Sequence, residues 1–248
     1  MAIVFVHGVP DTHLVWNQVL ERLDRADAKT VQLPGFGAPI PEGFTATKEE
    51  YVNWLALRLR ELSGGGPLDL VGHDWGSLLV VRVASVYPDL VRSWTGGAAP
   101  VSGEYVWHPA AQTWQAPGAG EAAMAALDEA VAFRMLCGYG VPPEQAAVTA
   151  RHIDPLMKDC ILRLYRSARN VFREWEPDLA RIRAPGLVLW GENDPFAAPH
   201  FADRMGEQTS ASRVVRLADC GHWWQCQRPD ETAYELQRHW RETESGST

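Results

Sequence analysis

The stretch Leu70-Val71-Gly72-His73-Asp74-Trp75-Gly76 decides how the rest of the chain is interpreted. An apolar run, Leu68 to Val71, enters it as a buried strand, and a helical pattern follows it. Glycines stand two residues before and two residues after Asp74. This spacing is typical of a nucleophile elbow, a strand-turn-helix bend so tight that only small side chains fit beside it. We therefore predict that Asp74 is the nucleophile, at a position where serine is usual.

Composition limits the classes of protein to consider. The chain has 248 residues, of which 46% are hydrophobic and 22% charged, and this suits one sizeable globular domain with room for an inserted lobe. The net charge of −8 argues against nucleic-acid binding. No apolar run approaches the ~20 residues of a membrane span, so no membrane association is expected.

The start of the chain and its cysteines point to a cytoplasmic protein. Residues 1–8 lack a basic segment and pass directly into a strand, which is not typical of a signal peptide. The cysteines form no CxxC pair and no disulfide framework, so reduced thiols are expected. They are Cys137, Cys160, Cys220 and Cys226.

Strand and helix patterns alternate through residues 1–99 and 185–248. Strands are expected at residues 3–6, 30–33, 68–71, 93–97, 186–190 and 214–217. Helices are expected after a cap at Asp11 or Thr12, after a capping box of Thr47 with Glu50, from Asp74 to about residue 87, and over residues 229–240 before a frayed tail at 243–248. This alternation predicts an α/β fold with a mostly parallel, doubly wound sheet.

Residues 100–184 follow a different pattern. Strand signals disappear, and alanine-rich helical stretches at 121–136, 145–152 and 156–175 are separated by Pro and Gly. We interpret this segment as a helical cap inserted into a core made of residues 1–99 and 185–248.

Three titratable residues follow strands in the order Asp74, Asp194, His222. Functional groups of open α/β sheets gather at the carboxyl ends of strands, and this is the chain order of nucleophile, acid and base. A catalytic His needs an acidic partner that fixes its tautomer, and Asp194 is placed for that. Taken singly, Asp194 is as well explained as a turn residue and His222 as a loop residue. Together with the elbow they predict a catalytic triad.

The turn His7-Gly8-Val9-Pro10 supplies a second part of the site. The backbone N–H groups of Val9 and Trp75 are expected to form an oxyanion hole. A metal site of His7 with Asp11 and His13 is the alternative, but the spacing fits no tidy ligand set. We therefore expect a structural His7, no metal and no cofactor.

Five motifs along the chain together resemble the α/β-hydrolase superfamily. They are His7-Gly8-Val9-Pro10, Pro34-Gly35-Phe36-Gly37, Gly72-His73-Asp74-Trp75-Gly76, the turn Gly191-Glu192-Asn193-Asp194 and Cys220-Gly221-His222. The Gly-His-Asp-Trp-Gly motif resembles the Asp-nucleophile branch, which contains epoxide hydrolases and haloalkane dehalogenases, and the chain is most similar to epoxide hydrolases.

An Asp nucleophile suits displacement at saturated carbon, which gives an alkyl-enzyme ester. His222 would then activate a water that attacks the Asp74 carboxyl carbon, and the oxyanion hole would hold the resulting charge. The two branch reactions differ in the leaving group, because a ring oxygen needs a proton donor and a halide needs polarised N–H groups.

Two cap segments bear on that choice. Leu164 to Asn170 resembles the Tyr-Arg segment of epoxide hydrolase caps, which implies that Tyr165 protonates the epoxide oxygen; the alternative is a packing tyrosine. Gln115 to Glu121 resembles a second such segment, before which another tyrosine is expected. This chain has Ala110 at about that place. His108 nearby would serve as a second donor, or is a surface His.

The alternative function is a haloalkane dehalogenase with the same triad, in which Trp75 and either Trp107 or Trp114 would hold the halide. Val9 offers no side-chain donor for a halide. A resemblance to fluoroacetate-type dehalogenases would imply an arginine directly after the Asp, to hold the substrate carboxylate, and this chain has Trp75 there. A small neutral organic substrate is therefore expected. Trp107, Trp114 and Phe36 are the expected pocket residues. A non-catalytic ligand-binding homologue is a third interpretation. Monomer and homodimer both stay open.

Overall fold

The computed structural model describes residues 2–23 and 25–245, and within them six strands form one parallel sheet in the order β2-β1-β3-β4-β5-β6. The strands are β1 (Ile3–Val6), β2 (Ala28–Val31), β3 (Leu68–Gly72), β4 (Val91–Gly96), β5 (Gly186–Gly191) and β6 (Arg213–Leu217). The α/β fold with a parallel, doubly wound sheet is thereby confirmed.

The second strand lies two residues earlier than predicted. Its pairing with β1 runs from Ile3 opposite Ala28 to Val6 opposite Val31. It ends there because β1 itself ends at the turn after Val6. The backbone N–H of Leu33, which the prediction placed in the strand, donates instead to Nε2 of His7 at 3.1 Å.

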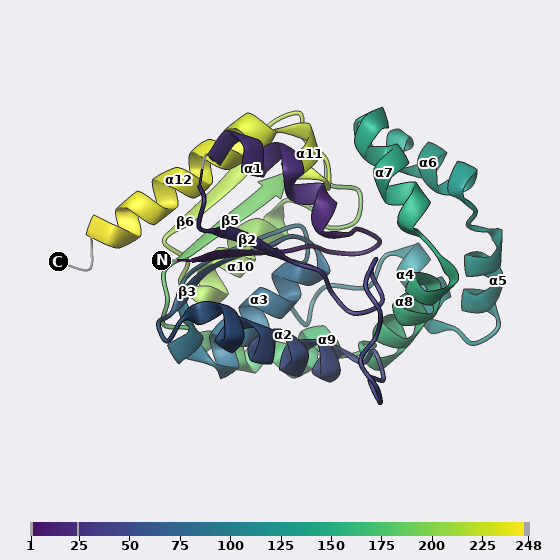
Figure 1. Cartoon of the computed structure of the whole chain (residues 1–248), viewed down its shortest axis with the longest axis horizontal. Coiled ribbons are helices and arrows are strands. Elements are labelled where there is room, and N and C mark those ends of the chain that lie inside the picture. The colour runs from purple at the N-terminus through teal and green to yellow at the C-terminus, as the bar shows by residue number, and fades with distance from the viewer. Residues whose placement is uncertain (1, 24, 246–248) are drawn as a thin grey trace.

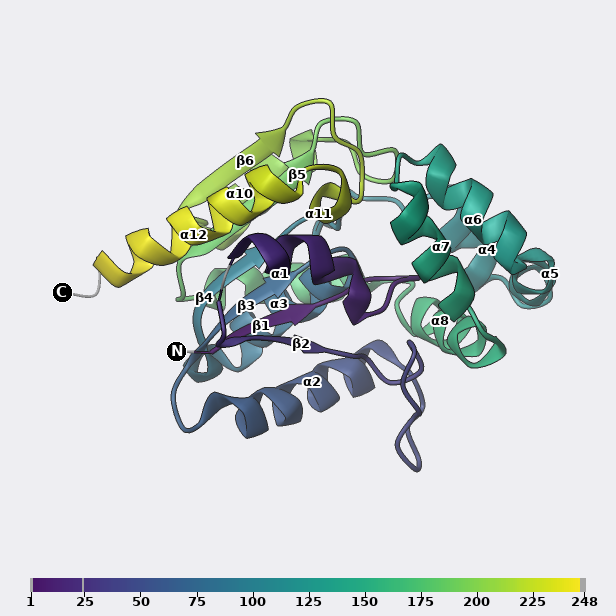
Figure 2. The same cartoon turned by 45° about the horizontal axis from the view of Figure 1, so that its top comes forward.

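Side chains of the central strands alternate between two apolar layers, as the period of a strand requires. Val4 and Val6 pack on the face covered by α2 (Lys48–Ser63), α3 (Trp75–Val86) and α10 (His200–Thr209). Ile3 and Phe5 pack on the other face, under α1 (Asn17–Leu23), α11 (Trp224–Gln227) and α12 (Pro229–Ser245). Figures 1 and 2 show these two helical layers on either side of the sheet.

The predicted helix starts were largely correct. Thr12 caps a short 3-10 helix, η1 (His13–Trp16), which continues into α1, and its hydroxyl accepts from the Leu14 N–H at 3.4 Å. Thr47 caps α2, with Oγ1 accepting from the Glu50 N–H at 3.4 Å. Such caps satisfy N–H groups that the first helical turn leaves free.

The tail prediction was wrong over residues 243–245, since α12 continues to Ser245. Acidic residues near its end pair with arginines of the sheet: Glu242 with Arg213 at 3.5 Å and Glu244 with Arg92 at 3.6 Å. Residues 246–248 of the predicted tail lie outside the described residues.

The segment between β4 and β5 is helical, and the name cap is kept for residues 100–184. Figure 1 shows α4 to α8 together at one end of the molecule. Its helices are α4 (Pro109–Gln115), α5 (Ala119–Ala126), α6 (Glu129–Gly138), α7 (Pro143–His152), α8 (Pro155–Ser167) and α9 (Val171–Trp175), followed by the 3-10 helix η3 (Glu176–Arg181).

Two cap helices predicted as continuous are each broken. The stretch 121–136 breaks where Asp128 caps α6 by accepting from the Val131 N–H at 2.7 Å. The stretch 156–175 breaks at Ala168, and α4 was not predicted. At Asp128 the periodicity missed a side-chain cap inside an apolar pattern, whereas no side-chain cap marks the break at Ala168.

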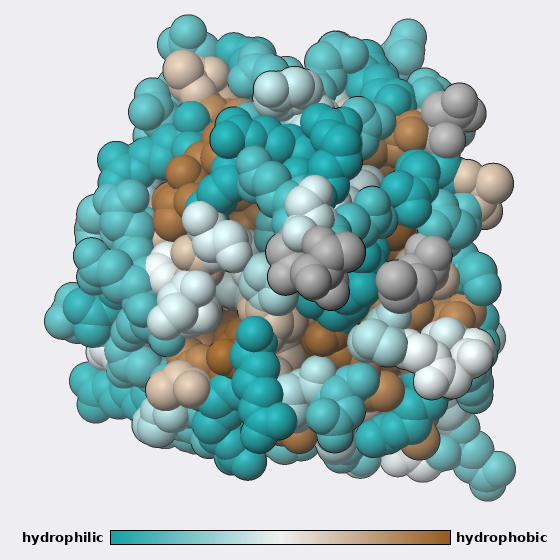
Figure 3. Space-filling model, turned by 90° about the vertical axis from the view of Figure 1, so that its left-hand side faces the viewer, coloured by the Kyte–Doolittle hydropathy of each residue, from teal (hydrophilic) through white to brown (hydrophobic). Residues whose placement is uncertain are grey.

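Among the described residues, no helix has both the length and the apolarity needed to cross a bilayer. Figure 3 shows the face opposite the cap, where hydrophobic areas are small and separated by hydrophilic side chains.

Candidate active site

Asp74 stands at the sharp bend between β3 and α3, with φ 53° and ψ −123°. Such a backbone conformation costs a non-glycine residue about 1–3 kcal/mol and is maintained only by its surroundings. A Cβ on Gly76 would lie 2.1 Å from the Val6 carbonyl oxygen, and one on Gly72 would lie 2.3 Å from the Gly76 carbonyl oxygen. The two glycines therefore allow the close approach of backbones that holds Asp74 in this bend.

Backbone N–H groups surround the Asp74 carboxylate. The Val9 N–H donates to Asp74 Oδ1 at 2.8 Å. The N–H groups of Val9 and Trp75 both act to lower the Asp74 pKa, as donors to a carboxylate do. The two donors expected to form an oxyanion hole thus lie at the Asp74 carboxylate.

His7 is a structural part of this turn. Its Nδ1 donates to the Gly8 carbonyl at 2.9 Å while Nε2 accepts from Leu33, and burial lowers its pKa to about 4. Over residues 2–23 and 25–245, no group of three or more His, Cys, Asp or Glu side chains is arranged to hold a metal ion.

The structure brings Asp74, His222 and Asp194 together. His222 Nδ1 lies 2.9 Å from Asp194 Oδ2, and His222 Nε2 lies 3.7 Å from Asp74 Oδ2. The other oxygen of Asp194 accepts from the backbone N–H groups of Phe196 at 2.8 Å and Ala197 at 3.2 Å. A carboxylate held in this way keeps a proton on Nδ1 and leaves Nε2 to face Asp74.

The charges of these groups are coupled. Burial raises the pKa of the Asp74 carboxyl, and His222 offsets part of that rise. Burial opposes a charge on His222, but Asp194 and Asp74 outweigh it, so the His222 pKa is raised. The pair therefore favours a carboxylate beside an imidazolium while Asp74 is free.

A cavity lies over the triad, between the carboxyl ends of the strands and the cap. The volume that the centres of water-sized molecules can occupy in it is about 70 Å³, which is several times the volume that one water needs. Apart from Asp74 and His222, its lining carries no formally charged side chain at neutral pH. The lining residues used below are Val9, Trp75, Tyr105, Trp107, His108, Ala110, Trp114, Tyr139, Tyr165, Phe196 and Trp223.

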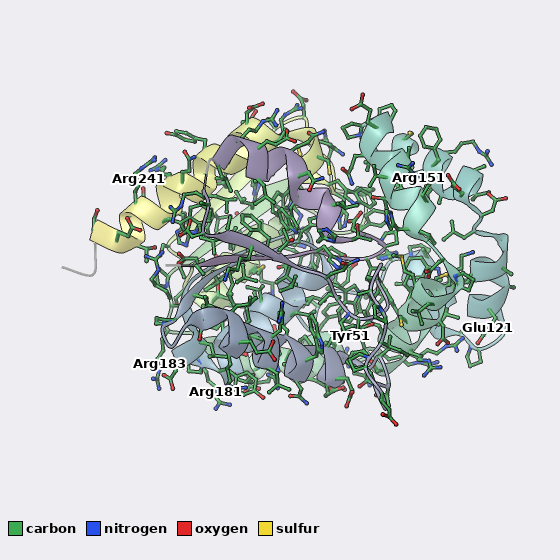
Figure 4. The ribbon with its side chains drawn as sticks, viewed as in Figure 1. Tyr51, Glu121, Arg151, Arg181, Arg183 and Arg241 are labelled. Atoms are coloured by element: carbon green, nitrogen blue, oxygen red, sulfur yellow. The ribbon has the colours of Figure 1, made fainter. Side chains whose placement is uncertain are left out.

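The predicted pocket residues fall into two groups. Trp107 and Trp114 line the cavity, as do Tyr165 and His108. Phe36 does not, and its assignment to the pocket was wrong. It is fully buried behind the His7 turn, with its ring 5.8 Å from that of His7 and 6.0 Å from that of Tyr51. Figure 4 shows Tyr51 on α2, outside the cap.

Tyr165, on the cap helix α8, lines the same cavity as Asp74. Its side chain is buried, and its ring lies 5.5 Å from the Trp75 ring and 4.9 Å from the Trp114 ring. Burial, and then the Asp74 charge, raise the Tyr165 pKa well above its usual value. The phenol therefore keeps its proton.

The segment carrying Tyr165 is held by an ion pair within the cap. The neighbouring residue, Arg166, pairs with Glu121 of α5 through two contacts of 2.8 Å. Figure 4 shows Glu121 at the outer edge of the cap. A two-pronged Arg–carboxylate contact fixes geometry more than a single contact does.

His108 is the N-cap of α4, and its Nδ1 accepts from the Ala111 N–H at 3.3 Å. The neutral ring therefore carries its hydrogen on Nε2. Burial lowers the His108 pKa to about 4, so the ring is neutral at pH 7. Ala110 lines the same cavity and offers no hydroxyl.

Sequence reasoning missed Phe196. Its backbone N–H holds Asp194, and its ring packs 4.9 Å from that of His222 and 4.9 Å from that of His108. Its carbonyl accepts from the Tyr105 hydroxyl at 2.9 Å. The available signal was its position directly after the Asp194-Pro195 turn.

Known proteins resemble this chain over most of its length. The alpha/beta hydrolase family profile matches residues 3–236. The (E)-2-((N-methylformamido)methylene)succinate hydrolase of Acinetobacter baylyi is 22% identical over 97% of this chain and 90% of that protein. Epoxide hydrolase 3 of Mus musculus is 24% identical over 92% of this chain and 67% of that protein.

The structural similarity concerns the fold. A haloalkane dehalogenase DbeA-M1 loop variant from Bradyrhizobium elkanii superposes with a TM-score of 0.79 at 19% identity, covering 100% of this chain and 91% of that one. At this identity the superposition shows a shared architecture.

Proposed function

The chain belongs to the alpha/beta hydrolase family, and from that premise we propose that it opens epoxides to vicinal diols through a covalent ester on Asp74. The observation that supports this most is the pairing of a buried, protonated Tyr165 phenol with the Asp74 carboxylate in one cavity. A phenol can protonate a ring oxygen as the carboxylate attacks the adjacent carbon.

In the first step an Asp74 oxygen bonds to an epoxide carbon and the ring C–O bond breaks. Oδ1 is engaged by the Val9 N–H, so we assign the attack to Oδ2. The ring oxygen takes the proton of the Tyr165 hydroxyl, and the Nε2–H of His108 is the second donor. The product of this step is a hydroxyalkyl ester of Asp74.

In the second step His222 takes a proton from water, and the resulting hydroxide attacks the Asp74 carboxyl carbon. Esterification removes one of the charges that raise the His222 pKa, so the imidazolium loses a proton, which replaces the one that Tyr165 gave up, and the neutral ring is free to accept a proton from water. Negative charge develops on Oδ1, where the Val9 and Trp75 N–H groups stabilise it; such a donor is worth about 10²–10³ in rate. The bond between the carboxyl carbon and the ester oxygen breaks, the leaving oxygen takes the proton from His222 to complete the diol, and Asp74 keeps one oxygen of the water. The remaining proton on the Asp74 carboxyl passes to His222, which restores the starting carboxylate and imidazolium.

The dehalogenase alternative has one observation in its favour. Among the described residues, the buried indole N–H of Trp75 has no partner at hydrogen-bond geometry, but it lies close enough to the Tyr165 hydroxyl to lower the pKa of that phenol. Of the two partner donors expected, Trp107 is engaged, because its indole N–H donates to the Ala168 carbonyl at 3.2 Å, while Trp114 lines the cavity. Val9 contributes only an apolar side chain. Trp75 and Trp114 remain as halide donors, but Tyr165 offers a ring oxygen a proton that it can transfer, and a halide does not need one; this favours epoxide opening.

The substrate we propose is small, neutral and apolar. Aromatic rings dominate the cavity lining, and no arginine or lysine lies in it. An anionic substrate would be desolvated there without a counter-ion and would meet the Asp74 charge.

The test offers the enzyme styrene oxide and 1-bromobutane and scores diol and bromide separately. Diol formation without bromide release is expected. Bromide release without diol would support the dehalogenase. His222→Gln with styrene oxide should accumulate an Asp74 adduct, seen by mass spectrometry of the intact protein and its peptides.

A further inference from the structure

Asp11 is a buried carboxylate that the proposed mechanism leaves unused. It directly follows the turn His7-Gly8-Val9-Pro10, and the residue is 1% exposed. Its two oxygens accept hydrogen bonds from two separate parts of the chain. Burying a carboxylate away from water costs free energy unless both of its oxygens accept hydrogen bonds. The two contacts therefore depend on one group, the Asp11 carboxylate.

One contact reaches the loop that carries the catalytic base. Asp11 Oδ2 accepts from the indole N–H of Trp223 at 2.9 Å. Trp223 directly follows His222, and the two rings pack edge-on with centroids 4.8 Å apart. The orientation of Trp223 therefore bears on the position of His222 and on the cavity wall.

The other contact reaches the cap. Asp11 Oδ1 accepts from the Thr149 hydroxyl at 3.2 Å, and this hydroxyl in turn accepts from Gln145 Nε2 at 3.4 Å. Gln145 and Thr149 are one turn apart on the buried face of α7, while Arg151 lies on its exposed face, as Figure 4 shows. Helix α7 thus meets the core through a polar contact with Asp11.

We propose that Asp11 is a positioning residue that ties the cap helix α7 to the base loop, residues 220–227, so that the two segments close the cavity as one unit. This deepens the proposed function, since it concerns the same cavity. It does not need epoxide opening to be correct, because the coupling is a property of the free protein.

The test is hydrogen–deuterium exchange on Thr149→Val, which removes the cap contact and keeps the shape of the side chain. We expect peptides from α7 and from the base loop to exchange faster, each by about tenfold, the factor that corresponds to losing one hydrogen bond to a charged group. Peptides from β3 should keep their wild-type rates. Trp223→Phe, which removes the base-loop contact, should reciprocally accelerate α7.

Two variants serve as controls. Thr113→Val removes another cap hydroxyl, one that bonds only its own helix at the Pro109 carbonyl, and should leave the base loop unchanged. Asp11→Asn can still accept from Trp223 and donate to Thr149, so both segments should keep near-wild-type exchange.

The proposal is overturned if Thr149→Val accelerates α7 alone, accelerates neither segment, or accelerates β3 equally. The first outcome would mean that α7 and the base loop open independently, and the second that the Thr149 contact stabilises neither segment. The third would mean that the substitution destabilises the whole fold. A failed epoxide assay would leave these exchange results intact, so the two proposals fail independently.

Discussion

Replacing Tyr165 by Phe tests the proposed proton donor most directly. The change removes one oxygen and keeps the ring that packs against Trp75, Trp107 and Trp114. We therefore expect the free energy of unfolding to change by about 1 kcal/mol or less. A loss of activity greater than this small change in stability can explain would then report on the chemical step.

The expected size follows from the position of the phenol. A general acid contributes about 10²–10⁴ in rate. Because His108 offers a second hydrogen to the same cavity, we expect the lower end, about 10²-fold, which is ~3 kcal/mol of barrier. The loss should fall on formation of the ester, since hydrolysis of the ester uses His222 and the oxyanion donors.

The assay is a stopped-flow single turnover with styrene oxide, in which ester formation and ester hydrolysis are resolved. Tyr105→Phe is the matched control, because that hydroxyl lines the same cavity but donates to the Phe196 carbonyl. The double variant Tyr165→Phe with His108→Ala should lose more than either single variant. Wild-type ester formation in Tyr165→Phe would refute the assignment.

The remaining predictions concern the nucleophile, the elbow and the buried carboxylate. Asp74→Asn should abolish diol formation while the melting temperature stays within a few degrees of wild type; measurable turnover in it would remove the covalent mechanism. Single-turnover reaction in ¹⁸O water should label Asp74 before the diol, and label found first in the diol would contradict the ester. Gly76→Ala should yield little folded protein by circular dichroism, because its Cβ would lie 2.1 Å from the Val6 carbonyl oxygen; a folded, active variant would disprove the packing argument. Burial chiefly raises the Asp11 pKa from 3.8 to about 6, so ionised Asp11 costs stability above pH 6 and nothing below pH 3.8. Asp11→Asn should then raise the melting temperature at pH 7 relative to wild type and not at pH 3.5, and an equal shift at both pH values would show that the charge is not the cause.

Some features of this chain are readable from local spacing. Glycines placed two residues on each side of Asp74 predict a bend that only small residues allow, and the structure has that bend. The order Asp74, Asp194, His222 places each group after a strand, and parallel strands end at one edge of the sheet. These are constraints of backbone geometry, so they do not depend on distant packing.

Other features were decided only by the tertiary structure. Phe36 belongs to a motif near the site, yet its ring packs behind the His7 turn, against His7 and Tyr51. The side of the turn on which a side chain packs depends on its neighbours in the folded protein. The stretch 121–136 breaks at the capping side chain of Asp128, which a periodic pattern does not separate from an ordinary surface residue. The roles of Tyr165 and His108 stay predictions that the activity assays address.

The sequence by itself determined the fold class, the bend at Asp74 and the order of Asp74, Asp194 and His222 after three strands, because each follows from residue types and spacings within short stretches of the chain. The tertiary structure alone decided which cap side chains face Asp74 and that Asp11 joins Thr149 to Trp223. Those contacts join residues far apart in the chain, and their geometry is set by the packing of whole segments, which no local spacing encodes.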